Sequence, residues 1–157
     1  MRITFMLVGA TDKKYLLEGI EDYQKRLIHY LPFDIKVIAD IKNSRNLSAD
    51  QQKEREGKAI LDLVSTGDEL VLLDVEGAEF SSPGLANWIE KRMLAGTRQL
   101  IFVVGGPYGF ADAVYKRADN KMSLSRLTFP HQLVRLLFIE QLYRAMTIIK
   151  GEPYHHA

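Results

Sequence analysis

The sequence of 157 residues contains no cysteine. Disulfides and thiolate metal sites are therefore excluded, and the absence is compatible with the reducing cytoplasm, where we expect this protein to work. Long hydrophobic runs are also missing. The apolar run at the N-terminus is too short for a signal peptide or a membrane span, so we interpret it as a first strand. The length and an ordinary composition, 46% hydrophobic and 26% charged, predict a single domain over residues 1–157.

A strong charge of one sign is absent too. The net charge of +1 alone argues against a nucleic-acid-binding protein. The distribution is less even, because the segment from Lys116 to the end has seven Lys and Arg against three Asp and Glu, whereas the rest has 14 against 17. Three of the four histidines also lie in that segment. A phosphate-bearing partner would suit this end of the chain, and chance asymmetry explains it equally well.

Several motifs of known chemistry do not occur. The sequence has no G-x-G-x-x-G and no G-x-x-x-x-G-K-[ST], so the common dinucleotide and phosphate loops are missing. It also has no metal-ligand spacing and no Ser-His-Asp pattern. We therefore expect no metal and no nucleophilic triad.

The periodicity of apolar residues predicts alternating strands and helices, which is typical of an α/β fold with a mostly parallel sheet and helices on both faces. The last helix is apolar on almost every side, which suggests that it packs on its own sheet and on a second subunit. Strands are expected at Arg2–Val8, Phe33–Ala39, Glu69–Asp74 (turned at Glu76–Gly77) and Leu100–Val104, with a short strand or extended link at Arg126–Phe129. Helices are expected at Lys13–His29, from a cap at Ser48 to Gly67, at Pro83–Ala95 after a cap at Ser82, at Ala111–Ala118 and at His131–Lys150.

The glycine-rich loop Gly105-Gly106-Pro107-Tyr108-Gly109 follows a buried strand. Glycines let a backbone approach a ligand closely, and open α/β sheets bind ligands where strands end. Because neither Lys nor Arg occurs in the loop, a neutral adenosine-like or cationic sulfonium ligand suits it better than a phosphate. A tight turn after a core strand would explain the loop alone equally well.

Three basic side chains near the last helix are candidates for substrate contact. His131 and Arg135 are four residues apart and are expected to share one face of the helix. Arg135 and Arg144 are nine apart and point to opposite sides, so a dimer would have to bring Arg144 to another subunit's site. Alternatively, Arg144 pairs with Glu140 one turn earlier, and His131 bonds nearby backbone.

Two further segments have two interpretations each. Lys42, Asn43 and Arg45 belong to the polar stretch 41–57, which is either a solvated connection or, less favoured, an RNA-facing or lid loop. The tail Tyr154-His155-His156 is either frayed, which termini usually are, or able to stack on a base or move a proton.

Four stretches together resemble the RlmH family, the SPOUT-class 23S rRNA pseudouridine N3-methyltransferases. They are LLD at 72–74, VVGGPYGF at 103–110, MSLSRLTFPHQLVRLLFIEQLYRA at 122–145 and the terminal PYHHA. The resemblance spans the whole chain. It implies a SPOUT α/β-knot with a C-terminal deep trefoil knot, an exception to ordinary connection rules, and a homodimer. It also implies S-adenosylmethionine as cofactor and a pseudouridine of the 23S rRNA in the ribosome as substrate.

The resemblance assigns residues by position. The cofactor would be held by Leu73, Gly105, Gly106 and the run Leu124, Ser125, Arg126, Leu127, Thr128 and Phe129. Substrate binding or catalysis would fall to His131, Arg135, Arg144, Tyr154 and His155.

The reaction implied is in-line methyl transfer to N3, where alignment of donor and acceptor supplies much of the rate gain. His155 is the first candidate for assisting loss of the N3 proton, and Arg135 or Arg144 for stabilising the developing anion or holding phosphate. A non-catalytic knotted RNA- or ribosome-binding module is the alternative, followed by a different nucleotide-binding enzyme.

Overall fold

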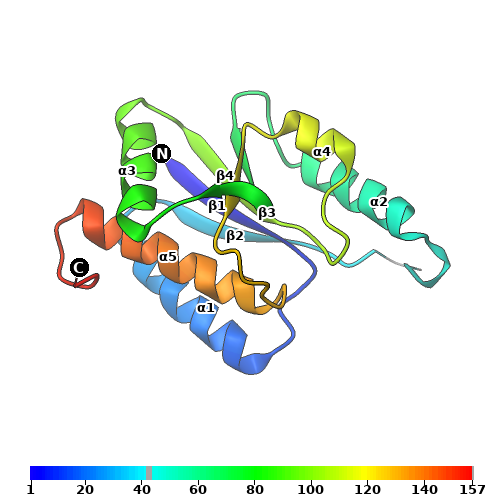
Figure 1. The fold of residues 1–157 in the computed structure, drawn as a ribbon, viewed down its shortest axis with the longest axis horizontal. Coiled ribbons are helices and arrows are strands. Elements are labelled where there is room, and N and C mark those ends of the chain that lie inside the picture. The colour runs from blue at the N-terminus through cyan, green and yellow to red at the C-terminus, as the bar shows by residue number, and fades with distance from the viewer. Residues whose placement is uncertain (42–43, 157) are drawn as a thin grey trace.

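A computed structural model describes residues 1–41 and 44–156 of the chain. Five parallel strands form one sheet in the order β2-β1-β4-β3-β5, with helices on both faces (Figure 1). The predicted α/β class with a parallel sheet is thereby confirmed. The strands are β1 (Arg2–Val8), β2 (Phe33–Ile38), β3 (Glu69–Glu79), β4 (Gln99–Val104) and β5 (Asn120–Ser123). The helices are α1 (Lys14–Leu27), a short 3-10 turn η1 (Ser44–Asn46), α2 (Ala49–Leu61), α3 (Ser82–Leu94), α4 (Asp112–Arg117) and α5 (Leu133–Ile149).

The sheet separates two hydrophobic cores, because successive side chains of a strand point to opposite faces. In β1, Phe5 and Leu7 face the core shared with α1, α3 and α5, whereas Met6 and Val8 face the core shared with α2 and α4. Phe138 of α5 packs against Phe5, with ring centroids 4.8 Å apart. The central strands are buried on both faces, which explains their nearly continuous apolar sequences.

One of the two predicted helix caps is confirmed, and the other is displaced by one residue. The Ser48 hydroxyl caps α2 by accepting a hydrogen bond from the Gln51 N–H. In turn, the Gln51 side-chain oxygen accepts one from the Ser48 N–H at 2.9 Å, as predicted. Helix α3 is capped by Ser81 rather than Ser82, so Pro83 falls one residue further into the first turn.

The fifth strand lies at Asn120–Ser123 and not at Arg126–Phe129, which the structure describes without regular secondary structure. Strand β3 also continues past the predicted turn at Glu76–Gly77 and ends at Glu79. Both Leu73 and Ala78 are in register with Met122, because β3 bulges around β5 between them. A Cβ at Gly77 would lie 2.4 Å from the Met122 backbone nitrogen. Gly77 is therefore needed for a close crossing of two backbones, not for a turn.

Helix α5 begins at Leu133, so His131 lies in the turn before it. Its buried side packs on the sheet, and α1 and α3 flank it, as Figure 1 shows for α1. Much of its apolar circumference is thus covered within one chain. None of the helices in the described parts of the chain is long and apolar enough to cross a membrane.

Candidate functional site

A cavity of about 560 Å³ lies at the carboxyl ends of β3, β4 and β5. Parallel strands place their loops together at this edge of a sheet, which is where α/β proteins bind ligands. The cavity brings together most of the residues that the resemblance assigns to the cofactor. They are Leu73, Gly105, Gly106, Leu124, Ser125, Leu127, Thr128 and Phe129. Arg126 does not line it, because its exposed side chain pairs with Glu79 at 3.0 Å.

The glycine loop forms one wall of the cavity. Its turn is closed by a hydrogen bond from the Gly109 N–H to the Gly106 carbonyl at 3.2 Å, and Gly109 has a φ of +81°, which favours glycine. A Cβ at Gly105 would lie 3.0 Å from the Phe110 ring. The loop therefore presents backbone to the cavity, as its composition predicted.

The opposite wall is the irregular segment after β5. The Ser123 hydroxyl donates to the Ser125 carbonyl, and the Leu127 N–H donates to the Ser125 hydroxyl, each at 3.0 Å. These bonds between near neighbours hold a bent backbone that has no partner strand. Leu127 is left 71% exposed at the cavity rim, where a ligand or another chain would cover it.

Asp74 is a cavity-lining residue that the sequence analysis did not select. Its carboxylate accepts from the Tyr115 hydroxyl at 2.5 Å and from the Glu76 N–H at 2.8 Å. Burial and, as a smaller effect, the hydrogen bond to Asp74 raise the pKa of Tyr115 to about 12. The phenol therefore stays a donor at neutral pH and fixes the Asp74 carboxylate. In the sequence, the position of Asp74 at the end of the apolar run LLD is the signal that could have selected it.

Arg135 is fully buried at the carboxyl end of β1. Its Nη2 donates to the Val8 carbonyl at 2.8 Å, and its Nη1 donates to the Gly9 carbonyl at 2.9 Å and to the Thr11 hydroxyl at 3.0 Å. Burial lowers the pKa of Arg135 from its ordinary value, with opposing effects of Asp12 and Asp40. The guanidinium thus fixes the carboxyl end of β1. The residue before Arg135, Val134, lines the cavity.

Arg135→Ala is expected to lower the free energy of unfolding by about 3 to 5 kcal/mol, because it removes a buried hydrogen-bonded cation and leaves two backbone carbonyls without their donors. Urea denaturation measures the loss. Arg126→Ala is the matched control and should leave stability unchanged, since that side chain is exposed. An equal effect of the two substitutions would contradict the positioning role.

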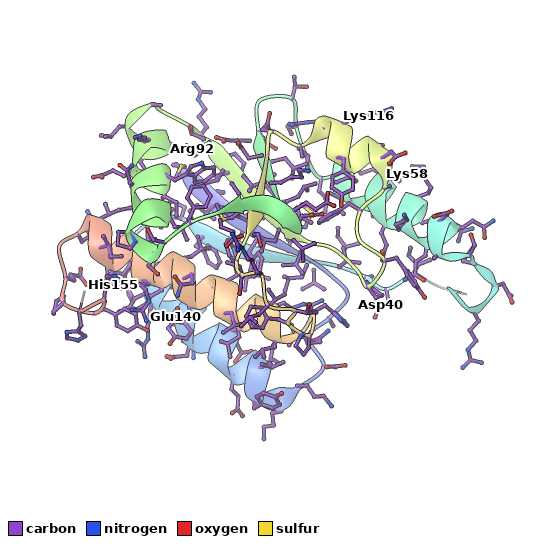
Figure 2. All side chains as sticks on the ribbon, viewed as in Figure 1. Asp40, Lys58, Arg92, Lys116, Glu140 and His155 are labelled. Atoms are coloured by element: carbon purple, nitrogen blue, oxygen red, sulfur yellow. The ribbon has the colours of Figure 1, made fainter. Side chains whose placement is uncertain are left out.

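His131 lines the cavity at the turn before α5 and is exposed. Arg144 and the tail residues lie elsewhere. Val134 borders the cavity, and Arg144 follows ten residues later, about 15 Å along the helix axis. Figure 2 shows Glu140 and His155 toward the C-terminal end of the molecule, with Asp40 toward the other end. Within one chain, the structure therefore brings His131 to the cavity but not Arg144, Tyr154 or His155.

The tail is docked rather than frayed. Tyr154 stacks edge-on against Tyr143 at 4.8 Å, and its hydroxyl donates to Glu140 Oε1 at 3.0 Å and lies 3.3 Å from the Tyr23 hydroxyl. Burial and these two partners raise the pKa of Tyr154 above its ordinary value, so the phenol is not a base. Tyr30 adds a hydrogen bond of 2.6 Å to Glu152.

Arg144 joins the tail to α5. It contacts Glu140 Oε1 through Nε at 3.1 Å and through Nη2 at 2.7 Å, which is the pairing expected from the spacing. Its Nη1 lies 3.2 Å from His155 Nδ1. Because a guanidinium only donates, Nδ1 must accept, and the neutral imidazole carries its proton on Nε2. In this arrangement His155 offers a donor to an incoming ligand, not a base.

The polar stretch 41–57 is described only in part. Lys42 and Asn43 lie outside the described residues. Arg45 is exposed in η1, and the rest of the stretch enters α2. Neither interpretation of Lys42, Asn43 and Arg45 is tested.

The lining fits the cofactor that the resemblance implies. A volume of about 560 Å³ is within the usual range of small-molecule sites, and apolar walls are combined with backbone groups, hydroxyls and one carboxylate. Neither Lys nor Arg is among the described residues that line the cavity, which suits a nucleoside with a cationic sulfonium. No group of three or more metal-ligating side chains occurs among residues 1–41 and 44–156.

Comparisons with known proteins agree over the whole chain. Residues 1–155 match the family described as "Predicted SPOUT methyltransferase". A protein of Parabacteroides distasonis named "Ribosomal RNA large subunit methyltransferase H" is 55% identical over 156 residues, which cover 99% of both chains. Proteins of the same name from Flavobacterium johnsoniae and Porphyromonas gingivalis are 53% and 48% identical, with the same coverage.

Proposed function

Because the chain belongs to the RlmH family of SPOUT methyltransferases, we propose that it is an S-adenosylmethionine-dependent methyltransferase of large-subunit ribosomal RNA. More finely, we propose N3 of a pseudouridine as the methyl acceptor and the assembled ribosome in the cytoplasm as the substrate. The observation that carries the proposal is the cavity between the glycine loop and the segment 124–129, whose lining is rich in backbone groups and contains neither Lys nor Arg among the described residues. A methyl donor that is already activated needs no metal.

The cofactor side of the site would use three kinds of group. The glycine loop offers close backbone contact, Asp74 offers a fixed carboxylate for hydroxyl or amino hydrogens, and Leu73 and Phe129 offer apolar walls. When bound, S-adenosylmethionine supplies an activated methyl group. The part played by the chain is to exclude water and to hold that methyl group in line with the acceptor.

The substrate side would be shared between two chains. Arg144, Tyr154 and His155 form one hydrogen-bonded cluster that lies away from the cavity of its own chain. A groove of about 390 Å³ shares Met122, Ser123 and Leu124 with the cavity and reaches Glu140, which holds this cluster. We propose that a second copy binds in this groove. We propose a homodimer in which the cluster of one subunit faces the cavity of the other.

Within that shared site, the residues take different roles. Arg144 stabilises the anion that develops on the base or holds a phosphate, and His155 donates from Nε2 to a carbonyl or phosphate oxygen. His131 contacts the substrate from the cavity rim. Arg135 acts through the β1 end that it orders and does not touch the substrate. A base role for His155 requires that its imidazole leave Arg144.

The bulge of β3 around β5 supports the trefoil knot that is typical of the family. Residues 74–77 pass around Met122, so a later part of the chain lies within a curve of an earlier part. We propose that the chain after β5 is threaded there, which would hold the cavity walls rigidly together.

A thermal-shift titration tests the cofactor assignment. S-adenosylmethionine at 100 times its Kd should add about 2.7 kcal/mol to the stability, and ATP or NAD should add nothing. The rival, a knotted ribosome-binding module without transferase activity, predicts no shift with S-adenosylmethionine. The other rival, a different nucleotide-binding enzyme, predicts a shift with ATP or NAD.

A further inference from the structure

Glu56 of α2 is a buried carboxylic acid for which the proposed reaction provides no role. Its exposed fraction is 5%, and Oε1 has no hydrogen-bond partner among the described residues. A buried carboxyl oxygen without a hydrogen-bond partner is costly, so proteins rarely retain one without use. It lies in the polar stretch whose purpose the sequence did not indicate.

The carboxyl group lies directly behind the glycine loop. A Cβ at Gly106 would lie 2.6 Å from both Glu56 oxygens, and Gly106 itself lines the cavity. A single residue without a side chain therefore separates Glu56 from the cavity. The adjacent Gly57 lets α2 approach α4, since a Cβ there would lie 3.0 Å from the Ala111 Cβ. The backbone of α2 thus holds the carboxyl group against the loop.

We propose that Glu56 is a specificity-determining residue that favours a cationic ligand in the cavity through its negative charge, acting across Gly106 without touching the ligand. This inference rests on the proposed function and extends it. The sulfonium of S-adenosylmethionine is cationic, whereas the thioether of the product, S-adenosylhomocysteine, is neutral, and the two are otherwise alike. A carboxylate behind the loop would therefore retain the methyl donor and favour release of the product.

The surroundings of Glu56 agree with a carboxylate that a cation would stabilise. Burial raises the pKa of Glu56 above its ordinary value. A side-chain hydrogen bond with Gln52 on the same helix opposes this shift, and the negative charge of Asp40 adds to it. Asp40 follows β2 and is labelled in Figure 2. Burial thus makes the ionised form of Glu56 costly, and a cation beyond Gly106 would offset that cost.

Isothermal titration with three ligands tests the proposal. Glu56→Gln keeps the shape and removes the charge, and Glu54→Gln makes the same change at an exposed position of the same helix. In Glu56→Gln we expect S-adenosylmethionine to bind roughly fivefold to tenfold more weakly, because the Coulomb attraction between the carboxylate and the sulfonium across the loop is lost. Sinefungin, whose amine is cationic at the same position, should weaken similarly. S-adenosylhomocysteine should bind as before, and Glu54→Gln should resemble the wild type.

An equal loss of affinity for all three ligands would show that Glu56 only supports the loop, and unchanged affinities would show that it has no role in binding. Either result overturns the inference and leaves the proposed function standing. Failure of the wild type to bind any of the ligands overturns both. If Glu56→Gln does not fold, titration of the wild type over a pH series decides. As the pH falls and the carboxylate is protonated, the affinity for S-adenosylmethionine should fall relative to that for S-adenosylhomocysteine, and a constant ratio of the two affinities down to the acid limit of folding would contradict the proposal.

Discussion

Gly77→Ala is expected to lower the free energy of unfolding by about 3 kcal/mol or more and to abolish cofactor binding. The added Cβ would lie 2.4 Å from the backbone nitrogen and 2.5 Å from the carbonyl carbon of Met122. Backbone atoms of a paired strand cannot move aside as the end of a flexible side chain can. The strands β3 and β5 would therefore have to separate where they cross.

The loss of binding follows from the same crossing. The cavity is lined by Leu73 and Asp74 from β3 and by Met122 and Ser123 from β5. If the two strands separate, these walls move apart, and the ligand loses contacts on both sides. Protein stability and cofactor affinity should therefore fall together.

Gly67→Ala is the matched control, because no atom lies within 4 Å of the position of its Cβ. Urea denaturation and a titration with S-adenosylmethionine should find it close to the wild type. If Gly77→Ala were as stable as Gly67→Ala, the close crossing of β3 and β5 would be wrong, and with it the support for the knot.

Arg144→Ala is expected to reduce methyl transfer by about 100-fold or more while binding of S-adenosylmethionine stays unchanged. The guanidinium holds His155 at 3.2 Å and Glu140 at 2.7 Å, so its removal releases the tail cluster as well as a positive charge. Because the cluster lies away from the cavity of its own chain, the affinity for S-adenosylmethionine should not change.

Mixing two inactive variants tests whether the site is shared. Gly105→Val should block the cavity, because a Cβ there lies only 3.0 Å from the Phe110 ring and the added methyl groups need further room. A heterodimer of Gly105→Val and Arg144→Ala would contain one site with an intact cavity and an intact tail cluster. About a quarter of the wild-type rate should return after exchange of subunits. Heterodimers without any activity would show that each site belongs to one chain.

The sequence analysis predicted the sheet well where local signals are strong. The continuous apolar runs of β1 and β4 and the capping pair Ser48 and Gln51 are local features, and each has the predicted role. The fifth strand was misplaced because Asn120–Ser123 is short and polar at its start, and only pairing with β3 makes it a strand. Similarly, Gly77 resembles a turn glycine in the sequence. A glycine is needed there because the backbone passes close to Met122, a residue far along the chain.

The candidate site shows the same division. The glycine loop and the segment 124–129 could be selected from the sequence because their composition is unusual, and the structure places both at one cavity. The burial of Arg135, the orientation of His155 and the position of Glu56 behind Gly106 depend on long-range packing, which residue types alone do not specify.

The most direct test of the account is methyl transfer from radiolabelled S-adenosylmethionine to purified large subunits and to assembled ribosomes, followed by mapping of the modified base. Ribosomes from cells that lack this protein provide the unmodified substrate, and Arg144→Ala is the inactive control. We predict one methyl group per ribosome, at N3 of a pseudouridine of the large-subunit rRNA, with assembled ribosomes as the better substrate. Incorporation into another base or RNA, or none with a protein that binds the cofactor, would contradict the account.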